Sequence, residues 1–135
     1  MPRLFRESPL MSIWEGSGNV AALDTLRAMA REPETIEAFF GELELSAGTD
    51  ARYDEALALL RKEFADTDDL QYRARQVVER MALLLQGGLL LRHGDPAVAA
   101  VFVASRLAGD WGVAFGTLPR GLDTARILER GRVAD

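Results

Sequence analysis

The feature that most constrains this chain is a long run of regular apolar spacing in its middle. Apolar or small side chains return every third or fourth position between residues 70 and 91: Leu70, Ala74, Val77, Met81, Leu84, Gly88 and Leu91. This period matches one face of an α-helix and not the two-residue period of a strand. A basic turn followed by glycine, Arg92-His93-Gly94, predicts where the helix ends. Because two adjacent glycines at 87 and 88 weaken a helix, we expect another helix to approach closely there.

Shorter segments with helical spacing flank this central one. They cover roughly residues 20–30, 33–43, 53–64, 97–108 and 122–129, and the residues before residue 20 are expected to be irregular. Capping residues are expected at Ser17 or Asn19, at Asp50, at Asp68 or Asp69 and at Asp95. No segment keeps the two-residue alternation of a half-buried strand. The sequence therefore predicts an all-α fold, a helical bundle of five to six helices.

Composition excludes several classes of site. The chain has 135 residues, which favours one domain, and it contains no cysteine and one histidine. Disulfides, thiolate metal sites and cysteine nucleophiles are therefore excluded, and no metal site is expected. The first residues do not have the pattern expected of a signal peptide, and the most apolar stretch, 81–91, is shorter than the roughly 20 residues that span a bilayer. We therefore expect a cytoplasmic protein with no membrane partner.

Charge is spread unevenly along the chain. The formal net charge of −5 argues against broad attraction to nucleic acid. Residues 33–70 hold three basic and eleven acidic side chains, whereas residues 71–135 hold nine basic and six acidic ones. Four arginines near the C-terminus form either a small nucleic-acid patch or ordinary solvated surface: Arg120, Arg126, Arg130 and Arg132.

The segment with the clearest chemical content is Ile13-Trp14-Glu15-Gly16-Ser17-Gly18-Asn19-Val20. A carboxylate beside bulky apolar side chains has its charged form disfavoured, which suits a general base near neutral pH. The glycines allow backbone to approach a ligand, and the N–H groups of the following helix can bind a negatively charged oxygen. From these residues alone, the segment is more often a loop with a purely structural role than a catalytic site. The segment also lacks the Gly-Lys-Ser/Thr ending of a phosphate-binding loop.

This segment resembles the active-site loop of acyl-CoA dehydrogenases. With its flanks, Arg6-Glu7-Ser8-Pro9-Leu10 and Leu23-Asp24-Thr25-Leu26-Arg27, it is most similar to the AidB-like adaptive-response branch. A weaker similarity from Tyr53 to the end resembles the extra C-terminal helical domain of that branch. The resemblance implies that residues 1–32 form the active-site loop and the last helix of the dehydrogenase bundle. Residues 33–135 would form the C-terminal helical domain.

The resemblance also implies a role for each matching residue. Glu15 would be the base that removes the α-proton of an acyl-CoA while FAD takes the β-hydride, and its backbone N–H would polarise the thioester carbonyl. Trp14 and Gly16 would lie beside the substrate, and Ser17 and Asn19 would contact FAD. Plain structural roles, such as core anchor or helix cap, are the alternatives for these residues.

Two further expectations follow from the family pattern. Arg27, on the helix after the loop, would be a neighbour of the active site or else a surface charge. No counterpart of the family's β-domain is present, so we expect a C-terminal fragment, a truncated frame or half of a split enzyme. Such a chain is expected to be inactive alone and not to retain FAD.

The partners expected are the missing dehydrogenase domains or a second copy. The apolar side chains Val20, Leu23 and Leu26 would be covered by self-association or by the other helices. The alternative function is a non-catalytic helical interaction module, or a DNA-associated module with weak DNA binding.

Overall fold

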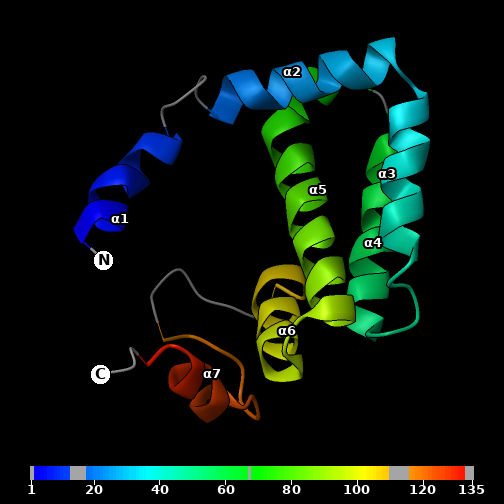
Figure 1. The fold of residues 1–135 in the computed structure, drawn as a ribbon. Coiled ribbons are helices and arrows are strands. Elements are labelled where there is room, and N and C mark those ends of the chain that lie inside the picture. Colours follow the sequence, from blue (N-terminus) through cyan, green and yellow to red (C-terminus); the bar gives the residue numbers. More distant parts are fainter. Residues whose placement is uncertain (1, 13–17, 67, 110–115, 133–135) are drawn as a thin grey trace.

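The computed structural model describes residues 2–12, 18–66, 68–109 and 116–132. Within these ranges the fold is all-α and has no strand, which confirms the predicted class (Figure 1). The described residues form seven α-helices, one more than the upper end of the expected range. The helices are α1 (Pro2–Glu7), α2 (Gly18–Arg31), α3 (Glu34–Glu44), α4 (Ala51–Ala65), α5 (Leu70–His93), α6 (Pro96–Phe102) and α7 (Thr124–Arg130).

The additional helix lies at the N-terminus, where an irregular start was expected. Helix α1 is followed by a 3₁₀ segment, η1 (Ser8–Ser12). Arg3 pairs with Glu7 one turn later at 3.0 Å, and the Ser8 hydroxyl donates to the carbonyl of Phe5 at 2.9 Å. These local bonds hold a short helix that buries no residue. Because it has no apolar stripe facing a core, apolar spacing does not reveal it.

Helix α5 is the centre of the molecule. Figure 1 shows α2 crossing the end where α5 begins, α3 and α4 running alongside it, and α6 packed near its C-terminal end. Helix α6 continues into a π-helical segment, η2 (Val103–Leu107), which contacts both α4 and α5. The helix with the longest predicted apolar stripe is therefore the one against which most of the other helices pack.

The core is formed by one apolar face of each of the helices α3, α4 and α5, and the face of α5 is the one that the spacing predicted. Its fully buried members come from α3, α4 and α5: Leu43, Tyr53, Leu57, Leu60, Val77 and Leu84. Half-buried side chains, including Phe40, Phe64 and Met81, pack around them. The rings of Phe40 and Phe64 meet edge to face with centroids 5.1 Å apart. Most of the burial therefore lies between α3, α4 and α5.

Tyr53 fills the space left by the two glycines of α5, which confirms the predicted close approach. A Cβ atom added to Gly88 would lie 2.8 Å from the Tyr53 hydroxyl and 3.0 Å from the Ser46 hydroxyl. A Cβ on Gly87 would lie 2.9 Å from a methyl carbon of Leu107. The buried Ser46 hydroxyl donates to the Gly88 carbonyl at 3.0 Å, and the Tyr53 hydroxyl donates to the Leu43 carbonyl at 2.9 Å.

Helix α2 docks on α5 through a different face from the one expected. Val20 is 55% exposed and Leu23 is 38% exposed, so the other helices do not cover these side chains, and the alternative expectation of self-association stays a prediction. Ala22, at 1% exposure, is the buried residue of α2, and Leu26 is half-buried. A small side chain at the contact lets the two helices approach closely. The orientation of α2 therefore follows from fit against α5 and not from the largest apolar residues.

Helix caps follow the predicted pattern at two positions. Asp50 accepts from the N–H of Arg52, and Asp95 accepts from the N–H of Ala97, each at 2.9 Å. Asp69 precedes α5 in the left-handed backbone region, with φ of 51°, and makes no side-chain cap bond. Asn19 lies inside α2 and is not its cap, and the other predicted cap, Ser17, is outside the described residues.

Candidate functional site at the start of helix α2

Most of the predicted active-site loop lies outside the described residues. This applies to Trp14, Glu15, Gly16 and Ser17, so their assignment to catalysis, substrate and FAD stays a prediction. The described part of the site begins at Gly18, the first residue of α2. The loop segment therefore leads directly into the N-terminus of a 14-residue helix.

The N-terminus of α2 lies beside a basic side chain of α5. A Cβ atom added to Gly18 would be 3.7 Å from Nη2 of Arg75. The unpaired N–H groups of a helix N-terminus favour negative charge, and a guanidinium strengthens that preference. Arg75 is far from Gly18 in the sequence, and no motif links the two, so sequence analysis missed it. The geometry makes this end of α2 electropositive.

Asn19 and Arg27 share helix α2 but differ in their surroundings. Asn19 is exposed on the first turn, within reach of groups that approach the helix N-terminus. Arg27 donates to Asp24 on its own helix at 3.0 Å, and both side chains are exposed. Arg27 also borders a crevice of about 370 Å³ between α2 and the start of α5, lined by Leu23, Leu26, Ala30 and Gln71. Its ion pair fits the alternative of a surface charge.

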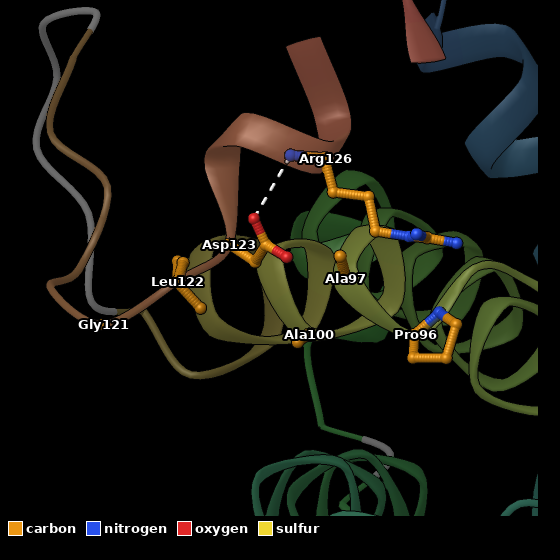
Figure 2. Close-up of a pocket in the computed structure, with 7 residues that line it drawn as sticks. All are labelled: Pro96, Ala97, Ala100, Gly121, Leu122, Asp123 and Arg126. Atoms are coloured by element: carbon orange, nitrogen blue, oxygen red, sulfur yellow. Dashed lines mark hydrogen bonds between the residues drawn. The ribbon is translucent and has the colours of Figure 1, made fainter. Parts of the chain in front are cut away.

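The four C-terminal arginines do not form one free basic patch. Arg126 and Arg130 both contact the carboxylate of Asp95, at 2.8 Å and 3.5 Å. Figure 2 shows the Arg126 side chain extending past Ala97 toward the Pro96 end of α6, with its backbone N–H bonded to Asp123. The other two arginines, Arg120 and Arg132, are exposed. Two of the four arginines of the predicted patch therefore already form ion pairs within the chain.

Asp95 is a residue whose importance sequence analysis underestimated. The hydrogen bond from Arg126 lowers the pKa of its carboxyl below the ordinary value, against the opposing effect of burial. The N–H of Ala97 and the charge of Arg130 act in the same direction as Arg126. The Asp-Pro pair in the sequence predicts the cap of α6. Nothing near Asp95 in the sequence indicates that two arginines of α7 pair with it.

The described residues contain no group of three or more histidine or acidic side chains arranged to hold a metal ion. Nor does any helix in these ranges combine the length and the apolar character that crossing a membrane requires.

Comparison with known proteins identifies relatives of this chain. AidB of Escherichia coli (strain K12), whose name places it provisionally among the acyl-CoA dehydrogenases, is 30% identical over 99 residues, covering 73% of this chain and 18% of AidB. Acyl-CoA dehydrogenase family member 11 of Caenorhabditis elegans is 27% identical over 119 residues, covering 74% of this chain and 19% of that protein. No family model matches the chain, and no solved structure matches it significantly.

The chain spans about a fifth of the length of these curated relatives. Both relatives carry the name of the family that the residues around Glu15 resemble. This chain is therefore a relative of the acyl-CoA dehydrogenases, similar to a segment of AidB.

Proposed function

We propose that this chain is the C-terminal portion of a flavin-dependent acyl-CoA dehydrogenase of the AidB-like type. The observation that carries the proposal is its similarity to two proteins named as acyl-CoA dehydrogenases, each over nearly three quarters of the chain. The start of α2 at Gly18 supports it, because the segment that resembles the catalytic loop then leads into an electropositive helix N-terminus.

In this proposal Glu15 is the catalytic base. Its carboxylate takes the α-proton of the acyl-CoA thioester, and its backbone N–H donates to the thioester carbonyl, where negative charge develops. FAD, when bound, would supply the hydride acceptor that forming a carbon–carbon double bond between the α and β carbons requires. Trp14 and Gly16 would line the space for the acyl chain and would keep water away from the reacting carbon.

The residues of this chain fit one part of an FAD site. Ser17 and Asn19 offer hydrogen-bonding groups at the start of α2, and Arg75 places positive charge beside Gly18. Both features suit a cofactor that carries a pyrophosphate. Since the chain spans about a fifth of its relatives, we propose that it supplies too few contacts to retain FAD alone.

We place the division between the two parts of the chain at Glu32–Pro33. Residues 1–32 would complete the dehydrogenase bundle, and residues 33–135 would form the extra helical domain. The bend between α2 and α3 is hydrogen-bonded, since the Thr35 hydroxyl donates to the Glu32 carbonyl at 2.7 Å. Helix α2 also packs against α5 of the second part. The alternative of a DNA-associated module is not favoured, because Asp95 already pairs with Arg126 and Arg130.

The catalytic proposal is tested in a dehydrogenase that contains this chain together with the missing domains. We expect Glu15→Gln to slow reduction of bound flavin by a saturated acyl-CoA at least about 100-fold, the usual cost of losing a general base. The flavin absorbance spectrum should stay unchanged. Glu7→Gln, at an exposed carboxylate paired with Arg3, is the matched control and should reduce flavin at the normal rate. Normal flavin reduction by the Glu15→Gln enzyme would refute the role of Glu15.

The cofactor proposal is tested on the chain alone. After incubation with FAD and gel filtration, we expect no flavin absorbance to elute with the protein. Flavin that stays with the chain would show that these residues form a complete cofactor site.

A further inference from the structure

Helix α7 is attached to the rest of the molecule mainly by charge. It has seven residues and buries none of them, and α6 is the element against which it packs. Its largest apolar side chain on the outer side, Leu128, is 72% exposed. Between α6 and α7 lies a crevice of about 430 Å³, which Figure 2 shows with its lining residues. Ile127 is half-buried and no residue of α7 is fully buried, so apolar packing contributes little to this interface.

The contact that bridges the two helices is the carboxylate of Asp95. Its side chain is only 5% exposed, and it accepts from the N–H of Ala97 on α6. It also accepts from Nε of Arg126 at 2.8 Å and from Nη1 of Arg130 at 3.5 Å, both on α7. One carboxylate therefore caps α6 and anchors α7. The two arginines lie one turn apart on α7, so both can reach the same acceptor.

A seven-residue helix does not persist by itself in water, because the cost of nucleation exceeds what so few hydrogen bonds return. Attachment of α7 to α6 and the helical state of α7 are therefore coupled. When the contact with Asp95 is lost, the backbone hydrogen bonds of α7 open with it. The core formed by α3, α4 and α5 does not involve α7 and stays closed.

We propose that α7 is a detachable latch on α6, held closed by Asp95 through Arg126 and Arg130. Opening widens the crevice along α6 and further exposes the half-buried Ala97 and Ala100, without unfolding the bundle. Asp123 and Glu129 also lie near Arg126, but both belong to the region of α7 itself and cannot tie it to α6. Asp95 is the acidic group that does so.

Hydrogen–deuterium exchange of residues 124–130, measured by mass spectrometry, tests the latch directly. We expect Asp95→Asn to speed exchange in this segment roughly fivefold, as expected for the loss of partly exposed ionic hydrogen bonds. Asparagine caps a helix as well as aspartate does, so exchange in α6 and α5 should not change. In the unaltered chain, exchange in α7 should rise between about 0.1 M and about 1 M salt, as the Debye length falls from about 10 Å to about 3 Å.

Two comparisons make the outcome decisive. Asp50→Asn is the matched control, since Asp50 also caps a helix and pairs with an arginine, but that arginine, Arg52, is on the same helix. It should leave α7 exchange unchanged. Arg126→Gln should reproduce the effect of Asp95→Asn, and the double variant should add little more. Unchanged α7 exchange in Asp95→Asn would overturn the proposal, and so would an equal rise throughout α5.

Discussion

The contact of Tyr53 with the glycine pair of α5 shows how single residues shape this fold. The ring of Tyr53 lies where side chains at 87 and 88 would otherwise be, and its hydroxyl reaches the Leu43 carbonyl. Burial raises the pKa of this hydroxyl above its ordinary value, so the phenol stays protonated and keeps donating. The sequence predicted a close approach at the glycines. It did not reveal Tyr53 as the partner, because the pairing of two helix faces depends on the loop between them.

At this contact we expect Gly88→Ala to destabilise the protein. The added Cβ would meet the Tyr53 hydroxyl at 2.8 Å, and overpacking of this kind costs about 1–3 kcal/mol of unfolding free energy. Gly41→Ala on α3 is the control, since nothing lies within 4 Å of its added Cβ. That change should stabilise the chain by up to about 1 kcal/mol through helix propensity alone. Urea unfolding measures both, and equal effects would contradict the close contact.

The buried hydroxyl itself should also contribute. We expect Tyr53→Phe to lower the free energy of unfolding by about 1 kcal/mol, because the Leu43 carbonyl loses its donor in a buried site. Tyr72, which is 96% exposed, provides the matched control, and Tyr72→Phe should leave stability unchanged. Thermal unfolding of the three proteins is the measurement. A Tyr53→Phe protein as stable as the unaltered chain would show that this hydrogen bond is energetically neutral.

At the level of whole helices, the capping residues were easier to predict from the sequence than the face that each helix buries. Asp50 and Asp95 cap α4 and α6 as expected, because a cap bond joins neighbours in the sequence. The apolar stripe of α5 was also predicted correctly, since this long helix packs against most of the others. The face of α2 was not, because the residue that α2 buries is the small Ala22, which the spacing of large apolar side chains does not indicate.

The cap of α4 gives a prediction about pH. The side-chain hydrogen bond from Arg52, opposed by burial, lowers the pKa of Asp50 in the folded chain. Its contribution to stability is therefore present above the ordinary carboxyl value of about 3.9 and is lost as pH falls through the lower folded value. We expect Asp50→Asn to cost up to about 1 kcal/mol at neutral pH. This cost should vanish at acid pH in urea titrations.

Glu55→Gln, at an exposed position of the same helix, is the control for that titration. Its difference from the unaltered chain should stay near zero at both pH values. A cost of Asp50→Asn that persists unchanged in acid would show that the ion pair with Arg52 does not contribute.

At the scale of the whole molecule, ion pairs between helices connect the acidic and basic parts of the sequence. Acidic residues of α3 and α4 pair with arginines of α5, as in Glu42 with Arg92 and Glu63 with Arg80. The acidic segment 33–70 and the basic excess after it are thus partly neutralised inside one bundle. This weakens any argument for an external polyanion or polycation from charge alone.

The arrangement around α5 also predicts which segments the fold can lose. Deletion of residues 2–12 should change the free energy of unfolding by less than about 0.5 kcal/mol, because α1 buries no residue. Deletion of residues 2–31 also removes α2 and should cost at least about 2 kcal/mol, since the α5 surface around Ala22 is then exposed. Urea unfolding of both shortened chains tests this. Equal stability of the two would mean that α2 does not stabilise the bundle.

The sequence by itself determined the all-α class, the approximate extent of α2 to α5, the buried face of α5 and the resemblance to acyl-CoA dehydrogenases. Each of these depends on residues that are near one another in the chain, where spacing and local hydrogen bonds act directly. Only the tertiary structure decided that Arg75 lies at the N-terminus of α2, that Asp95 holds α7, and that Ala22 turns inward. These are contacts between distant segments, and their geometry is set by how whole helices fit together.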